Sequence, residues 1–256
     1  MADNLSWLRR RIHPEERYGL RVTLYAIATT MVLIPFSYLL VQVTTEGPLT
    51  EFDTDAAEAI HNIVKDNGFL RGLSFLFSYL GTPVWFYITV GVSAIFFSRQ
   101  NHKHVAAYLA VTNLLGGAID TALKILVDRP RPELEDPITH AFGKSFPSGH
   151  AMASTIGYGT LLLAWMPLIP VRLRKWAIAA YFLMVAAVAT SRLGLGVHFF
   201  SDVVGGFVLG LAWLAVGTAA FSVWRREEHK ERVHVMEGAE PEVIDIEHHH
   251  PRQEKV

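Results

Sequence analysis

Three polar clusters interrupt an otherwise apolar chain, and their side chains are suited to binding an anion that has several oxygens. The clusters cover residues 124–132, 146–150 and 191–202. Their cationic side chains need an anionic partner, because uncompensated charge near lipid is costly. Arginine offers a planar fork that fits phosphate, and lysine adds a point charge. The predicted phosphate-binding cations are Lys124, Arg131 and Arg192.

The second cluster predicts an anion site at the start of a helix. Pro147 fits the first turn of a helix, where its missing N–H costs nothing. The free backbone N–H groups and the positive dipole end of a helix N-terminus bind anions. Ser148 adds a hydroxyl, and Gly149 allows the backbone to approach a ligand closely. We therefore expect Ser148 and Gly149 to bind the same phosphate as the cations.

Two histidines complete a set of groups that could transfer a phosphoryl group. His198 and Asp202 are four residues apart, so they share one face of a helix. A carboxylate on one ring nitrogen fixes the tautomer and makes the other nitrogen more basic. His198 is therefore the predicted nucleophile, oriented by Asp202. His150 begins a different helix and has no such partner in sequence, so it is the predicted general acid for the leaving oxygen. These roles need no metal or cofactor, and none is predicted.

The elements that must position these residues are membrane-spanning helices. The chain is 51% hydrophobic and only 18% charged, below the roughly 25% charged residues of soluble domains. About 20 apolar residues in a helix cross a membrane, and six segments satisfy this requirement: residues 22–45, 72–98, 105–123, 151–171, 176–191 and 203–224. We predict an all-α integral membrane protein whose six transmembrane helices form a bundle. The bundle covers residues 22–224, between an N-terminal tail of residues 1–21 and a charged tail of residues 225–256, which we expect to be disordered beyond its first turns.

The distribution of lysine and arginine predicts the orientation in the membrane. Basic segments recur on one predicted side, at residues 9–21, 99–103, 172–175 and 225–226. The positive-inside rule then places both termini in the cytoplasm and all three polar clusters on the extracytoplasmic face of the cell membrane. The first span is too long for a typical signal peptide, so we interpret it as a retained helix.

One extracytoplasmic segment and several single residues carry further expectations. Residues 55–66 have helical spacing, with Ala56, Ile60 and Ile63 on one side. This spacing favours a helix on the membrane surface, and an ordered loop is the alternative. Asp120 precedes Lys124 by four residues, which predicts an ion pair. Arg129 binds either the phosphate or only lipid headgroups. Four histidines without a motif partner are expected at the surface: His61, His102, His104 and His140.

Composition also excludes several classes of chemistry. The chain has no cysteine, which rules out disulfides, thiolate catalysis and cysteine-ligated metals. It has no long basic block, so no nucleic acid partner is expected.

The three clusters together resemble the motifs of the type 2 phosphatidic acid phosphatase superfamily. Those motifs are lysine, six residues and Arg-Pro; Pro-Ser-Gly-His; and Ser-Arg, five residues, histidine, three residues and aspartate. Residues 124–132, 147–150 and 191–202 fill every motif position in this order. The resemblance implies a phosphohistidine on His198, proton donation by His150, and a phosphate held by the cations with Ser148 and Gly149. The family also includes soluble vanadium haloperoxidases, which the predicted spans disfavour.

We therefore predict a membrane phosphatase that acts on a lipid phosphate or lipid diphosphate. Phosphatidic acid, phosphatidylglycerol phosphate and undecaprenyl diphosphate are all candidates, because the motifs contact only the phosphate. Two alternatives remain. One is an anion transporter, since helix N-termini and cations can form a substrate site. The other is a metal-dependent hydrolase with His150, His198 and Asp202 as ligands. The sequence predicts no oligomeric state.

Overall fold

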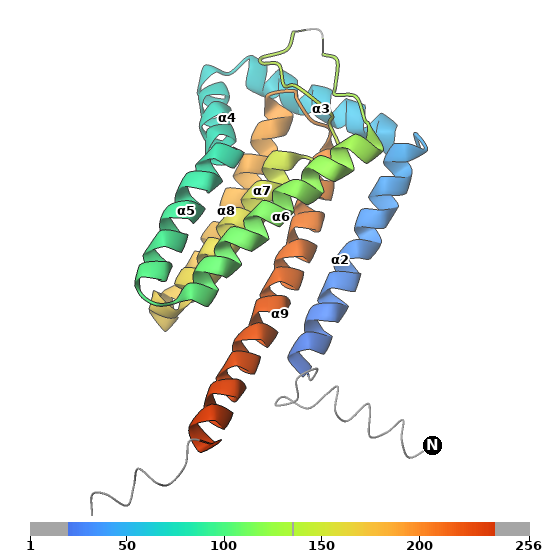
Figure 1. The fold of residues 1–256 in the computed structure, drawn as a ribbon. Coiled ribbons are helices and arrows are strands. Elements are labelled where there is room, and N and C mark those ends of the chain that lie inside the picture. The colour runs from blue at the N-terminus through green and yellow to red at the C-terminus, as the bar shows by residue number, and fades with distance from the viewer. Residues whose placement is uncertain (1–19, 135, 239–256) are drawn as a thin grey trace, which may run out of the picture.

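The computed structural model describes residues 20–134 and 136–238, and within them every regular element is helical (Figure 1). The helices are α2 (Leu20–Thr44), α3 (Leu49–Lys65), α4 (Gly68–Leu80), α5 (Pro83–Arg99), α6 (Lys103–Val127), α7 (Gly149–Trp165), the 3-10 turn η1 (Met166–Leu168), α8 (Val171–Gly194) and α9 (Phe200–Gly238). The predicted tail of residues 1–21 lies almost wholly outside the described residues, as does the end of the chain from residue 239.

The predicted all-α membrane bundle is confirmed. Among the described residues, five helices are long and apolar enough to cross a membrane: α2, α6, α7 with η1, α8 and α9. The pair α4 and α5 passes the same test together, which gives six spans if the pair counts as one. Many apolar side chains on these helices are exposed, as expected where lipid rather than water is the solvent.

The predicted second span is not one straight helix. It breaks after Leu80, and the two halves are bent by 48°. Thr82 begins α5 as its N-cap, because its hydroxyl accepts a hydrogen bond from the Trp85 N–H at 3.2 Å. Pro83 occupies the first helical position, where it is tolerated. The break lets α4 pack against α8 while α5 packs against α6 and α7.

Two other predicted boundaries differ from the structure. Helix α8 begins at Val171, so the basic residues 172–175 lie in its first turns rather than in a loop. Helix α9 continues to Gly238, well beyond the predicted end of the last span at residue 224. The segment after residue 224 is rich in arginine, glutamate and lysine, which are strong helix formers, and it extends a helix already nucleated within the bundle.

Helix α3 forms as predicted but buries a different face. Its buried residues are Asp53, Ala57, His61 and Val64, whereas Ile63 is 63% exposed. The expectation that His61 lies at the surface is therefore wrong. Its two ring nitrogens lie 3.2 Å from the Gly194 carbonyl oxygen and 3.0 Å from the Asp136 carbonyl oxygen. Because α3 lies across the end of the bundle and packs on α8, its polar face is covered by protein (Figure 1).

The helices α7 and α9 pack closely through small residues. A Cβ added at Gly206 would lie 2.5 Å from the Ser148 carbonyl oxygen and 3.1 Å from the Ala151 Cβ. This close approach also positions the start of α7, because the Ser148 N–H donates to the Asp202 carbonyl oxygen at 2.9 Å. The glycine in α9 thus holds the second and third polar clusters together.

We expect Gly206→Ala to lower the Tm of the detergent-solubilised protein by about 2–10 °C, since overpacking against backbone costs about 1–3 kcal/mol. Gly91→Ala in α5 is the matched control, because a Cβ there meets nothing within 4 Å. Alanine is also the better helix former, so this variant should keep or slightly raise the Tm. Equal melting temperatures for both variants would contradict the packing described above.

Candidate active site

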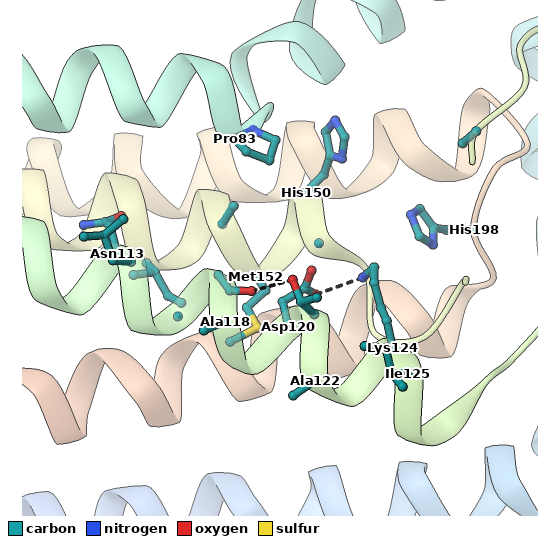
Figure 2. Close-up of a pocket in the computed structure, with 18 of the residues that line it drawn as sticks. Pro83, Asn113, Ala118, Asp120, Ala122, Lys124, Ile125, His150, Met152 and His198 are labelled. Carbon is teal, nitrogen blue, oxygen red and sulfur yellow. Dashed lines mark hydrogen bonds and ion pairs between the residues drawn. The ribbon is translucent and has the colours of Figure 1, made fainter. Parts of the chain in front are cut away.

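The three polar clusters meet in one pocket (Figure 2). It lies at the end of the bundle where α6 and α8 finish and α7 and α9 begin (Figure 1). The pocket has a volume of about 840 Å³. Six of the predicted site residues line it: Lys124, Arg131, Gly149, His150, Arg192 and His198. The other two, Asp202 and Ser148, are fully buried beside it.

Three cations and one carboxylate face this pocket. Lys124 in the last turn of α6 donates to Asp120 Oδ1 at 2.9 Å, which confirms the predicted ion pair, and to the Pro147 carbonyl oxygen (Figure 2). Arg192 in the last turn of α8 donates to the Ser78 hydroxyl on α4. The excess of positive charge is a property that a bound dianion would balance.

Arg131 reaches the pocket because α6 ends abruptly. Asp128 closes the helix in the left-handed region, with φ of 54°, and its N–H donates to the Lys124 carbonyl oxygen. The chain then turns back, and the Arg131 guanidinium donates to three carbonyl oxygens, at 2.7 Å to Val197, 3.0 Å to Gly143 and 3.1 Å to Phe142. These bonds hold the guanidinium beside His198, with Nη1 3.2 Å from His198 Nε2.

The geometry of His198 makes Nε2 the unprotonated ring nitrogen. Nδ1 lies 3.4 Å from Asp202 Oδ2, and Nε2 lies 3.2 Å from Arg131 Nη1. Because arginine can only donate, Nε2 is the acceptor in this arrangement and Nδ1 carries the proton. Gly196 makes the turn that brings His198 here, with φ of 72°, which a residue with a side chain rarely adopts.

His150 lines the pocket from the first turn of α7, next to the break between α4 and α5 (Figure 2). A Cβ added at Gly81 would lie 3.4 Å from His150 Cδ2 and only 2.3 Å from Val188 Cγ1. The break is therefore packed tightly behind the histidine, and it fixes the wall of the pocket on that side.

Two polar atoms at the site have no partner among the described residues. They are the Ser148 hydroxyl and Arg192 Nε, and both are buried. An unsatisfied buried polar group costs about 1–3 kcal/mol. Arg192 lines the pocket and is therefore suited to a ligand there, whereas Ser148 is buried beside the pocket. Gly149 matters here because a Cβ would lie 2.9 Å from Asp120 Oδ2 and 3.4 Å from Lys124 Nζ.

Arg129 does not line the pocket. It is buried and donates to Asp202 Oδ1 at 2.6 Å and to Asp53 Oδ2 at 2.8 Å. Sequence reasoning also missed three residues of this region: Asp53, Ser145 and Ser201. Ser145 donates to Asp202 Oδ2. No local pattern identifies them, because their partners are distant in the chain.

Burial lowers the pKa of His198 from 6.5 to about 4, with Asp202 opposing the shift and Arg131 and Arg192 adding to it. The imidazole is thus neutral above about pH 4. We expect the acid limb of kcat/KM, corrected for ionisation of the substrate, to lie well below pH 6.5, near the pH of about 4 at which His198 protonates. A corrected profile that falls through pH 6.5 would contradict this environment.

Metal ligation receives no support from geometry in the described part of the chain. Residues 20–134 and 136–238 bring together no group of three or more His, Asp or Glu side chains that could hold a metal ion. The metal-dependent alternative would use His150, His198 and Asp202 as ligands. Asp202 contacts His198 Nδ1 and does not line the pocket that His150 lines.

Three comparisons with known proteins all find similarity to membrane phosphatases or to their superfamily. The model of the PAP2 superfamily matches residues 105–226. Phosphatidylglycerophosphatase B of Bacillus subtilis (strain 168) is 38% identical over 96 residues, which are 36% of this chain and 46% of that protein. The match thus spans about half the length of this relative. The crystal structure of a transmembrane PAP2 type phosphatidylglycerolphosphate phosphatase from Bacillus subtilis has the same fold, with a TM-score of 0.68 and 23% identity, over 74% of this chain and 94% of that one.

Proposed function

We propose that the chain, whose residues 105–226 match the model of the PAP2 superfamily, belongs to this superfamily and is a membrane phosphatase that hydrolyses a lipid phosphate or lipid diphosphate. One observation carries the proposal. His198, with its unprotonated Nε2 beside Arg131 and with Asp202 behind the imidazole, lines the same pocket as Lys124, Arg131 and Arg192. A nucleophile and several cations around one space suit phosphoryl transfer.

The reaction follows from these positions in two steps. His198 Nε2 attacks phosphorus and forms an N–P bond, while the bond from phosphorus to the lipid oxygen breaks. Protonated His150 gives its proton to that leaving oxygen, and the cations stabilise charge on the remaining oxygens. A water molecule then attacks the phosphohistidine, His150 takes its proton, and the N–P bond breaks. The products are inorganic phosphate and a lipid alcohol or, where the substrate is a lipid diphosphate and the leaving oxygen is the bridging one, a lipid monophosphate. Both histidines return to their starting states.

The pocket shape supports a lipid as substrate. Its polar end holds His198 and Lys124, and it continues between α6 and α7 along apolar residues as far as Asn113 (Figure 2). Leu114, Ala118 and Ile156 line this apolar part. An acyl or prenyl chain would lie there while the phosphate occupies the polar end. The relatives named for phosphatidylglycerol phosphate make that lipid the first substrate to test.

The direct test is phosphate release from the detergent-solubilised protein with EDTA present. Phosphatidylglycerol phosphate, phosphatidic acid and undecaprenyl diphosphate are compared side by side. We expect release from at least one of them that EDTA does not change. Loss of activity on chelation would instead support a metal-dependent hydrolase. Uptake of phosphate into vesicles without hydrolysis would support a transporter.

We expect Gly117→Leu to raise KM for a long-chain lipid phosphate about tenfold, because burial of several methylene groups is lost at about 0.8 kcal/mol each. Gly117 lines the apolar part of the pocket, and a Cβ there meets nothing within 4 Å. Turnover of glycerol 3-phosphate, which has no chain, should stay unchanged. Gly72→Leu on α4, also with open space around it, is the matched control. If Gly117→Leu impaired turnover of the long-chain lipid and of glycerol 3-phosphate equally, the apolar part of the pocket would not be the binding site of the lipid chain.

The orientation in the membrane is part of the proposal. The distribution of lysine and arginine supports an extracytoplasmic site and cytoplasmic termini. All residues that line the polar end of the pocket would then act at the outer leaflet of the cell membrane.

A further inference from the structure

The buried guanidinium of Arg129 contacts Asp202 on the side away from His198 Nδ1. Arg129 Nη1 donates to Asp202 Oδ1 at 2.6 Å and to the Ser201 hydroxyl at 2.8 Å. Its Nη2 donates to Asp53 Oδ2 at 2.8 Å, and the ring of Phe199 lies 4.2 Å from its Cζ. One cation is thus shared by two carboxylates, both with no exposed surface.

The contacts of Asp202 are divided between its two oxygens. Oδ1 accepts from Arg129. Oδ2 faces His198 Nδ1 and accepts from the Ser145 hydroxyl and from the Phe199 N–H at 2.9 Å. Because each oxygen has its own donors, the carboxylate cannot rotate without breaking several charge-assisted bonds. Arg129 also fixes Ser145, whose N–H donates to the Arg129 carbonyl oxygen at 2.9 Å.

Asp53 extends this arrangement to α3, the helix that lies across the end of the bundle (Figure 1). Its Oδ1 accepts from the Ser201 N–H at 2.8 Å, and its Oδ2 accepts from the Ser201 hydroxyl. A carboxylate that accepts from the first turn of a helix acts as an N-cap, here supplied by another helix. Asp53 therefore holds the first turn of α9, the turn that carries Asp202.

We propose that Arg129 and Asp53 are positioning residues that set the orientation of Asp202 and, through it, of His198, so that α3 belongs to the catalytic assembly. This inference rests on the proposed phosphatase activity. Neither residue lines the pocket, so neither touches the substrate. Their removal should therefore change turnover and leave substrate binding nearly intact.

The test uses the full-length protein in detergent and three variants, Arg129→Gln, Asp53→Asn and the double variant. We expect kcat to fall about 10–100-fold for Arg129→Gln, as for other groups that orient a reactive histidine, with KM within about twofold of wild type. Asp53→Asn should lose less. The double variant should lose less than the product of the two single losses, because Arg129 and Asp53 contact each other and hold the same turn of α9.

A pH profile separates positioning from a loss of folded protein. Without Arg129 the full charge of Asp202 acts on His198, so the acid limb of kcat/KM should move to higher pH. Lys65→Gln is the matched control. It breaks an ion pair of 3.2 Å between α3 and Asp136 that touches no catalytic group, and it should keep wild-type kcat and the wild-type profile.

Several results would overturn the inference. One is folded Arg129→Gln protein with wild-type kcat. Another is a lower yield of folded protein that keeps the wild-type kcat per folded molecule and the wild-type pH profile of kcat/KM. Independent, additive losses in the double variant would also contradict it. If Arg129→Gln does not fold, Arg129→Lys and Asp53→Asn decide by the same criteria. A wild-type protein that releases no phosphate would instead overturn the proposed function itself.

Discussion

His198→Ala is expected to lower kcat for phosphate release by at least about 10³-fold, because it removes the only predicted nucleophile. His198 Nε2 is the ring atom that faces the pocket, and the imidazole is otherwise buried and held by Asp202 and Ser145. Substitution leaves the cations in place, so binding of the lipid phosphate should change much less than turnover. Phosphate release and KM, measured on the same preparation, separate the two effects.

Two further variants make this result specific. His140→Ala changes an exposed histidine of the same loop region and should keep wild-type activity. His150→Ala should slow release of the lipid alcohol and also hydrolysis of the intermediate, because His150 serves both steps. Undiminished activity of the His198→Ala variant would show that another group attacks phosphorus and would end the proposed mechanism.

Arg131→Ala is expected to lower kcat/KM by about 10²–10³-fold, the loss typical of removing a preorganised donor to transition-state charge. The guanidinium lies 3.2 Å from the nucleophilic nitrogen, so a phosphate attacked by His198 would lie beside it. Its three carbonyl partners fix its plane before substrate binds. Preorganisation of this kind avoids a reorganisation cost during the reaction.

Arg131→Lys should recover only part of the lost activity, because a lysine keeps the charge but cannot present two parallel donors. Arg99→Ala is the matched control, since Arg99 is exposed at the end of α5 and lines no part of the pocket. If Arg99→Ala lost as much activity as Arg131→Ala, the overall charge of the protein, rather than a guanidinium placed in the pocket, would support turnover. The kinetics of all three variants should be compared with their melting temperatures.

Hydropathy and the spacing of a few polar residues predicted most of the membrane bundle. The long uncharged runs correspond to α2, α6, α7, α8 and α9 within a few residues at most ends. The break between α4 and α5 was missed, although Gly81, Thr82 and Pro83 signal it, because all three residues lie within one apolar run. Hydropathy measures the preference for lipid and does not detect a helix cap.

The polar clusters were predicted to meet, and the structure brings them to one pocket. Each span carries the chain to the opposite side of the membrane, so the number of spans between two clusters determines whether they lie on the same side. This is why the three clusters were predicted to lie together. The interpretation of His61 and Arg129 failed for a different reason. Each is buried by partners from remote segments, such as Gly194 for His61 and Asp53 for Arg129.

The sequence by itself thus determined the helical class, the shared end of the polar residues and the i,i+4 pairs of Asp120 with Lys124 and His198 with Asp202. These features depend on local spacing and on transfer into lipid, which a linear pattern encodes. Only the tertiary structure decided which nitrogen of His198 faces the pocket, where Arg131 lies, and that Asp53 and Arg129 stand behind Asp202. Those contacts join residues far apart in the chain, so they exist only after the helices have packed.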